Sequence, residues 1–277
     1  MTIVVTGATG HLGRLTIESL LAKGVPATEI VGVGRQIEKI ADLGVTVRQA
    51  AYEDPAALRA AFEGADKVLL ISGSEPGKRV PQHANVIEAA KDAGVGLLVY
   101  TSAPKADTTD MKLAAEHAET ERLIKESGLP YVILRNGWYI ENYPVDQALA
   151  QGLVGASGDG KISVAPRADY AEAAAAVLAT DGHVGKIYEL GGEAVTKAEL
   201  AAEISRQSGK QVTYTDLDVD KYKELLIGVG LPSEAAEVFA DVDRATAAGA
   251  LFVPRDDLEQ LLGRPATPVA TAIKSAL

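Results

Sequence analysis

Three glycines near the N-terminus have the spacing of a dinucleotide-binding turn. The segment Thr6–Gly13 reads TGATGHLG, between a β-branched run and an amphipathic helical pattern. Gly7 would permit the tight turn, Gly10 the approach of a pyrophosphate, and Gly13 close packing of the helix on the strand. Free N–H groups at the helix N-terminus would then bind the phosphates. We therefore predict a dinucleotide site here; the alternative is a glycine-rich turn without a ligand.

The residues after the second predicted strand favour NADPH over NADH. An NAD site has Asp or Glu at this place to accept hydrogen bonds from the ribose hydroxyls. This chain instead has Val33-Gly34-Arg35-Gln36, without a carboxylate. The planar guanidinium of Arg35 suits a 2′-phosphate, and Lys39 would add a weaker charge. The alternative for Arg35 is an ordinary surface arginine.

Two further loops are predicted at the same edge of the sheet, because ligands lie at the carboxyl ends of parallel strands. After the third strand, Tyr52–Asp54 could approach the adenine, with Asp54 as the candidate. After the fourth strand, Ser72, Gly73 and Ser74 are small residues where a ribose must pass. Both segments also fit ordinary loop chemistry.

These residues need a layered scaffold, and the first 142 residues predict one. Short apolar runs at 2–6, 30–33, 45–47, 67–72, 97–101 and 131–134 alternate with helical patterns at 12–23, 55–64, 81–93 and 111–127. Strand–helix alternation at this spacing predicts an α/β fold, a Rossmann-type doubly wound parallel sheet.

The pattern changes after Asn142. Residues 152–160 are glycine-rich and read as a loop, followed by a helix at 168–179, strands at 187–190 and 212–215, and a helix that begins with a capping box at Thr196. No Pro-, Gly- and Ser-rich linker separates the halves. We predict an NADP-binding domain over 1–142 and a smaller C-terminal α/β lobe over 143–277, which lies on the substrate side and is not an independent domain.

Composition excludes several classes of function. The chain has 277 residues, 27 Lys+Arg against 38 Asp+Glu, and no cysteine. A net charge of −11 argues against direct nucleic-acid binding. The four histidines have no metal-ligand spacing, so we predict no metal. No apolar run is long enough for a membrane span, and no signal peptide is visible, so a cytoplasmic protein is expected.

The helix expected at 111–127 lacks the Tyr-x-x-x-Lys pair that serves carbonyl reduction on this fold. His117 lies near the expected tyrosine, and Glu121, four residues later, has the opposite charge to the lysine. We predict that His117 packs or lies on the surface rather than acting as an acid. Glu116, Glu119 and Glu121 are expected on a solvated face.

Several segments together resemble the NmrA-like, atypical short-chain dehydrogenase family. They are the glycine turn, Arg35, Leu70–Glu75 (LISGSE), Tyr100–Ser102 (YTS) and Leu134–Tyr143 (LRNGWYIENY). The similarity continues through GDGKI, RADYA and SGKQVTY to cover nearly the whole chain. The resemblance implies an NADPH-preferring reductase that passes a hydride directly to a quinone, without flavin or metal.

The resemblance also implies which residues bind the cofactor. They are Gly7, Ala8, Thr9, Gly10, His11, Leu12, Gly13, Arg35, Ser72, Gly73, Ser74, Asn136, Gly137, Trp138, Tyr139, Ile140 and Glu141. Two other functions are weighed: a non-catalytic NADP-binding redox sensor, which stays open, and an isoflavone-reductase-like enzyme, which is weaker because Lys112 is its only candidate base. A homodimer of the chain also stays open as an assembly.

Quinone chemistry explains why the Tyr–Lys pair can be missing. Hydride addition to a quinone gives a delocalised, weakly basic phenolate-like oxygen, so placement and hydrogen-bond donors suffice. Asn136, Tyr139 and Asn142 supply polar groups after the sixth strand and are the predicted catalytic residues, with Trp138 as a flat apolar wall. The alternative is a capped strand end with an aromatic plug. Thr101–Ser102 carry hydroxyls there without an evident partner.

Overall fold

Seven short, mostly apolar strands form the centre of the protein. In the computed structural model, which describes residues 1–277, they are all parallel and pair in the order β10-β6-β5-β4-β1-β2-β3. They span Ile3–Val5 (β1), Ile30–Gly34 (β2), Thr46–Gln49 (β3), Lys67–Leu70 (β4), Leu97–Ser102 (β5), Tyr131–Asn136 (β6) and Ile187–Leu190 (β10). The order reverses between β1 and β4, which confirms the doubly wound sheet.

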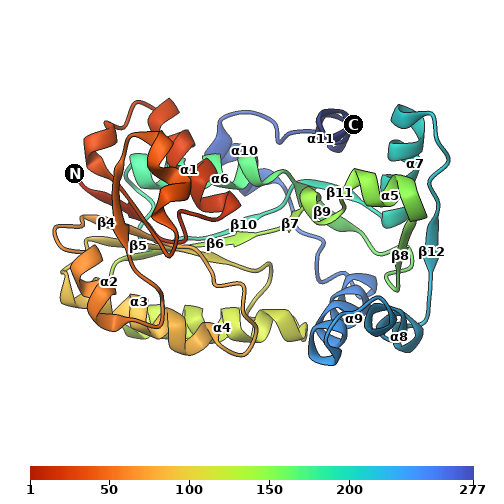
Figure 1. Ribbon diagram of the computed structural model, residues 1–277, viewed down its shortest axis with the longest axis horizontal. Helices are drawn as coiled ribbons and strands as arrows, with labels where there is room; N and C mark the ends of the chain where they lie inside the picture. Colours follow the sequence, from red (N-terminus) through yellow and green to blue (C-terminus); the bar gives the residue numbers. More distant parts are fainter.

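Helices cover both faces of this sheet (Figure 1). On one face lie α1 (His11–Ala22), α6 (Arg167–Ala179) and α10 (Asp256–Leu262), and on the other α2 (Pro55–Ala61), α3 (Arg79–Asp92) and α4 (Lys112–Glu126). Successive residues of a strand point to opposite faces. Ile3 and Val5 therefore pack in the core with α1 and α6, and Val4 packs in the core with α2 and α3.

The C-terminal half builds a third core beside the carboxyl edge of the sheet (Figure 1). Its strands are β7 (Trp138–Tyr139), β9 (Ile162–Ala165) and β11 (Glu193–Val195) in one small sheet, and β8 (Leu153–Gly155) with β12 (Tyr214–Asp216) in another. Its helices are α5 (Val145–Gln151), α7 (Lys197–Ser208), α8 (Val219–Gly228), α9 (Ser233–Ala247) and α11 (Val269–Ala276). Short 3₁₀ turns lie at Ala27–Glu29, Ile37–Leu43 and Ile140–Asn142. None of the helices has the length and apolar character needed to cross a bilayer.

The structure corrects three details of the predicted elements. The glycine-rich stretch 152–160 is not all loop, because Leu153 donates its N–H to the Thr213 carbonyl oxygen (2.9 Å) and begins β8. The strand predicted at 67–72 ends at Leu70, so its last residues belong to the following loop. The helix predicted from Pro81 begins two residues earlier, at Arg79.

Candidate active site

The glycine turn joins β1 to α1 at the point where the strand order reverses. Gly7 has φ +60°, in the left-handed region that favours glycine. A Cβ at Gly13 would lie 2.4 Å from the Gly7 carbonyl oxygen, so only glycine lets the helix start so close to the turn. Ala8 donates its N–H to Val33 in β2 (3.0 Å). The turn is thereby fixed against the strand whose end should select the cofactor.

The first turn of α1 is suited to a phosphate. Its N-cap, Gly10, provides no side-chain cap, and no acidic residue lies in the first turn. The backbone N–H groups and the positive end of the helix dipole are therefore left for an external anion. Together with the close approach that the glycines permit, this turn fits the pyrophosphate of a dinucleotide.

Arg35 directly follows β2 and presents an exposed guanidinium. Its side chain is 70% exposed, and its nearest acidic atom, Glu75 Oε1, is 3.9 Å from Nη1. Gln49 donates to the Arg35 carbonyl oxygen (3.0 Å), which holds the backbone. Asp54, a candidate for the adenine, instead caps α2 by accepting from the N–H groups of Ala56 and Ala57. The geometry around Arg35 suits a 2′-phosphate better than a ribose hydroxyl.

The loop after β4 is held through its main chain. Ser72 donates its N–H to Thr101 Oγ1 (2.9 Å), and Gly73 donates its N–H to His83 Nε2 (2.9 Å). Arg79 Nε donates to the Gly73 carbonyl oxygen (2.6 Å). Thr101 had no evident partner in the sequence. In the structure it holds the main chain of the loop that is predicted to lie beside the ribose.

An unpaired buried polar atom lies at the end of β6. Asn136 is buried, and its Oδ1 is the only buried side-chain nitrogen or oxygen without a hydrogen-bond partner. Its Nδ2 donates to the Tyr139 hydroxyl (3.3 Å). Burial raises the pKa of Tyr139, although Asn136 and Arg167 lower it, so the hydroxyl keeps its proton at neutral pH. Asn136 thus offers an acceptor, and Tyr139 a donor hydrogen, to a ligand.

A free donor and a free acceptor remain whichever way the Asn136 amide is oriented, although the two residues exchange these roles when it is turned over. If the amide is turned over, Tyr139 donates to Oδ1, and the Nδ2 hydrogens and the phenol oxygen remain free. A buried unpaired polar atom costs free energy unless a ligand or water fills the vacant hydrogen bond. The pair complements a carboxamide, as on a nicotinamide ring, or the oxygen of a carbonyl acceptor.

Arg167, on α6, contacts the residues around the Asn136–Tyr139 pair, which we call the Asn136–Tyr139 corner. Its guanidinium carbon lies 4.6 Å from the centre of the Tyr139 ring, and its Nη2 donates to Asn142 Oδ1 (3.0 Å). Its N–H also donates to Glu141 (2.9 Å). Asn142 is exposed and contacts Arg167. Sequence reasoning did not place Arg167 beside Asn142, because the two residues are 25 positions apart in the chain and meet only through the fold.

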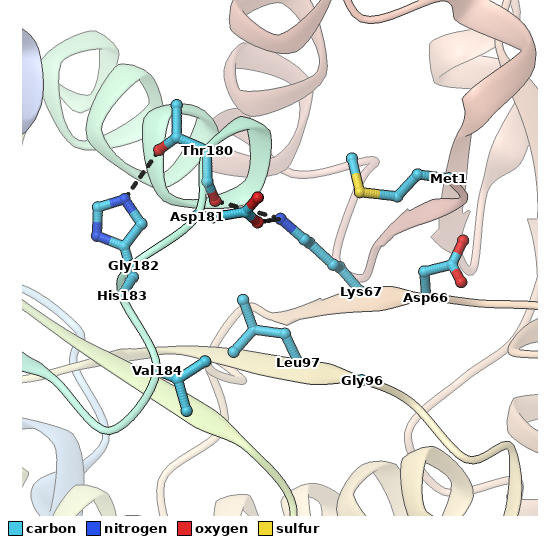
Figure 2. Close-up of a pocket in the computed structure, with 10 residues that line it drawn as sticks. All are labelled: Met1, Asp66, Lys67, Gly96, Leu97, Thr180, Asp181, Gly182, His183 and Val184. Carbon is cyan, nitrogen blue, oxygen red and sulfur yellow. Dashed lines mark hydrogen bonds and ion pairs between the residues drawn. The ribbon is translucent and has the colours of Figure 1, made fainter.

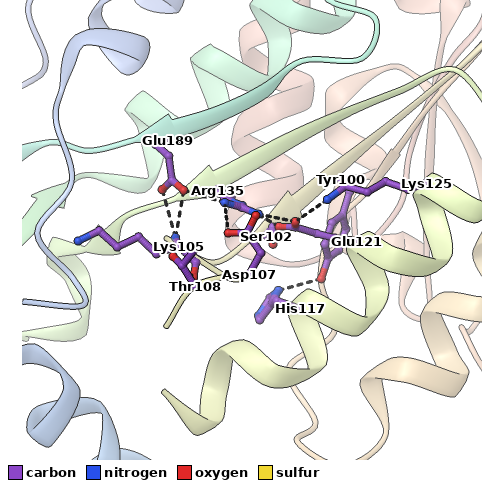
Figure 3. A network of polar contacts seen from close by, with 10 residues as sticks. All are labelled: Tyr100, Ser102, Lys105, Asp107, Thr108, His117, Glu121, Lys125, Arg135 and Glu189. Atoms are coloured by element: carbon purple, nitrogen blue, oxygen red, sulfur yellow. Dashed lines mark hydrogen bonds and ion pairs between the residues drawn. The ribbon is translucent and has the colours of Figure 1, made fainter. Parts of the chain in front are cut away.

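A buried ion-pair network takes the place of the Tyr–Lys pair (Figure 3). Arg135 donates to both carboxylate oxygens of Glu121, from Nε at 2.9 Å and from Nη2 at 2.6 Å. Its Nη1 reaches Asp107 (2.8 Å) and Glu189 (3.0 Å). Ser102 Oγ donates to Glu121 Oε1 (2.7 Å). The expectation that Glu121 lies on a solvated face is therefore wrong: Glu121 is 1% exposed, because Arg135 neutralises it.

His117 is a packing residue, one of the two roles expected for it. It is 6% exposed, and its Nδ1 lies 2.8 Å from the hydroxyl of Tyr100, a fully buried residue of β5. Burial and the nearby Arg79 lower the pKa of His117 to about 3. The ring is therefore neutral at pH 7, and its hydrogen bond is made with Tyr100 rather than with Asn136 or Tyr139. No group of three or more His, Cys, Asp or Glu side chains is placed to bind a metal.

A surface hollow of about 510 Å³ lies at the opposite, amino-terminal edge of the sheet (Figure 2). Its polar groups are engaged within the protein. Lys67 Nζ donates to the carbonyl oxygens of Leu178 and Thr180, and His183 lies 2.8 Å from Thr180 Oγ1 and 2.7 Å from the Tyr188 hydroxyl. We assign no ligand to it, and the glycine turn, the β4 loop and the Asn136–Tyr139 corner remain the candidate site.

The fold and this site are those of a nucleotide-dependent dehydrogenase, and comparison with known sequences gives the family. Residues 7–181 match the model of the NAD(P)H-binding family, and the chain belongs to that family. It is 50% identical to quinone oxidoreductase 2 of Escherichia coli (strain K12), over 98% of this chain and 97% of the relative.

Solved structures agree with this placement. The NADPH complex of the Escherichia coli NADPH-dependent quinone oxidoreductase matches with a TM-score of 0.95 and 50% identity, covering 99% of each chain. The NADP(H) complex of the Citrobacter sp. triphenylmethane reductase matches with a TM-score of 0.93 and 37% identity, covering 100% of each chain.

Proposed function

We propose that the protein is an NADPH-dependent quinone reductase that passes a hydride directly to its acceptor, without flavin. The observation that carries the proposal is the 50% identity, over almost the full length of both chains, to a quinone oxidoreductase. The site supports it: an anion-binding turn, an exposed Arg35, and a buried donor–acceptor pair at the carboxyl edge of the sheet.

The roles of the residues follow from their chemistry. The first turn of α1 binds the pyrophosphate, and Arg35 binds the 2′-phosphate. Asn136 and Tyr139 orient the reacting rings through one acceptor and one donor. When bound, NADPH would supply the hydride, and a quinone that takes this hydride and one proton would become a hydroquinone. Because the hydroquinone anion is weakly basic, water supplies that proton and no dedicated acid is required.

Steady-state NADPH oxidation tests the proposal. Purified protein should oxidise NADPH rapidly only when a benzoquinone or naphthoquinone is added, and NADH should be used less well. Tight binding of NADPH without turnover across several quinones would overturn the reductase and support a redox sensor, because a sensor needs the same cofactor residues.

Three further expectations stay predictions. A cytoplasmic location is checked by fractionation, assembly with a second copy by light scattering, and the expected lack of DNA binding by titration with DNA.

A further inference from the structure

A histidine that appeared isolated in the sequence bears directly on the cofactor loop. His83, on α3, is fully buried, and its Nε2 accepts the N–H of Gly73 at 2.9 Å. Gly73 is the middle residue of the small-residue loop after β4. A buried ring therefore holds the main chain of a loop that is expected to lie against the dinucleotide.

The position of the ring proton follows from the partners of His83. Thr120 Oγ1 donates its single hydrogen to the Glu116 carbonyl oxygen (2.8 Å), one turn earlier in α4. It can therefore only accept from His83 Nδ1, which lies 2.9 Å away. The proton is on Nδ1, and the Nε2 lone pair is left for Gly73. Burial, and then Arg79, lower the pKa of His83 to about 4, so the ring stays neutral at pH 7.

Two tyrosines pack against the His83 ring, and Arg79 makes a second hydrogen bond to the main chain of the loop. Tyr52 and Tyr100 make edge contacts with His83, at centroid distances of 6.2 and 5.5 Å. Arg79 Nε donates to the Gly73 carbonyl oxygen (2.6 Å), and its Nη1 lies 3.5 Å from Glu116 Oε2. Both polar groups of the Gly73 main chain are thus bound by α3.

We propose that His83 is a positioning residue for the dinucleotide, which transmits the geometry of α4 through Thr120 to the Gly73 main chain. This inference rests on the proposed NADPH site but not on the acceptor. His83 itself touches neither ligand; it keeps the loop after β4 in the shape that accepts the cofactor. We expect the effect to be on cofactor binding and to be the same for NADPH and NADH, because both carry the ribose that this loop is predicted to contact.

Two substitutions at His83 separate positioning from packing. In His83→Gln, the amide oxygen can reach the place of Nε2 and accept from Gly73, whereas His83→Leu offers no acceptor. Dissociation constants are measured from the fluorescence of bound NADPH and NADH, with no quinone present. His83→Leu should weaken both cofactors by the same factor, on the order of tenfold, because the half-buried N–H of Gly73 loses its acceptor and no longer holds the loop. His83→Gln should recover most of the affinity.

His117→Leu is the matched control, since His117 is also a buried histidine, and it bonds Tyr100 and not the loop. It should leave both dissociation constants close to those of the wild type. Equal weakening in the Leu and Gln variants of His83, or the same weakening in His117→Leu, would overturn the proposal in favour of a packing role. Loss of quinone turnover with these binding results intact would count against the proposed function alone.

Thr120→Val provides a second route if His83→Leu does not fold. Without the Thr120 oxygen, the ring proton is no longer held on Nδ1, and the form with the proton on Nε2 cannot accept from Gly73. We expect weaker binding of both cofactors and faster hydrogen exchange of the Gly73 amide. Unchanged binding and unchanged exchange would overturn the relay through Thr120.

Discussion

Arg35 is the residue on which cofactor choice depends. It is exposed and has only a distant contact with Glu75, so no internal partner competes strongly with a phosphate. Arg35→Gln should raise the KM for NADPH by about 10- to 100-fold, the loss of a charge-assisted contact, and leave the KM for NADH nearly unchanged. Arg59→Gln, an exposed arginine paired with Asp92, is the control. An equal loss for both cofactors would contradict the assignment.

Tyr139 and Asn136 form the other residue-scale test. Tyr139→Phe and Asn136→Ala each remove one member of the donor–acceptor pair, so each should lower kcat/KM for a quinone by roughly 10-fold or more. Because the two groups bond each other, the double variant should lose less than the product of the single losses. Steady-state kinetics of the three variants check this. Additive single effects would indicate that the two residues act independently.

At the scale of elements, the Arg135–Glu121 pair connects β6 to α4. Removing Glu121 leaves Nε and Nη2 of the buried Arg135 without their acceptor, while Asp107 and Glu189 still bind Nη1, so Glu121→Ala should lower the free energy of unfolding by about 1–3 kcal/mol. The apolar double variant Glu121→Leu with Arg135→Met should recover much of this loss. Urea unfolding measures both. A Glu121→Ala protein as stable as the wild type would show that the Arg135–Glu121 pair does not stabilise the fold.

Two buried histidines on α3 and α4 make stability depend on pH. Burial lowers the pKa of His117 to about 3 and of His83 to about 4, both below the unfolded value. The unfolded chain therefore binds more protons between these values and about 6.5, and stability falls as pH falls. The slope should approach roughly 1.4 kcal/mol per pH unit for each histidine between pH 6 and pH 5. Urea unfolding of His117→Leu should show a shallower slope; an unchanged slope would mean that His117 does not contribute to it.

The sequence predicts a feature well when the residues that determine it lie close together in the chain. The turn at Gly7–Gly13 and the strands of the sheet follow from spacing and periodicity within a few residues. The partner of Glu121 could not be found in this way, because Arg135 lies 14 residues further along the chain and on another element. His83 likewise gains its role from Thr120 and Gly73, which reach it through the fold. β8 was missed because its pairing partner, β12, lies about 60 residues away.

At the scale of the molecule, the C-terminal half returns to the main sheet. β10 pairs with β6, and α6 packs on α1 in the same core. Lys105, the one non-glycine residue with positive φ, donates its N–H to Glu189 and its Nζ to the Gly249 carbonyl oxygen. We therefore propose that residues 143–277 are a lobe integrated with the NADP-binding part.

A fragment of residues 1–142 tests this integration. It lacks α6 and β10, so the edge of β6 and the apolar face of α1 would be exposed to water. We expect the fragment to aggregate or to unfold without a cooperative transition, as circular dichroism during urea titration would show. A fragment that unfolds cooperatively and binds NADPH like the full chain would make the division at 142 a true domain boundary.

Direct hydride transfer from NADPH to a quinone is tested most directly by rapid mixing. Full-length protein, shown by absorbance to carry no flavin, is saturated with NADPH and mixed with a naphthoquinone while oxidation of the nicotinamide is followed. NADPH deuterated on one face of the nicotinamide should react more slowly, and NADPH deuterated on the other face at the normal rate. Oxidation only after flavin is added, or no oxidation at all, would contradict direct transfer.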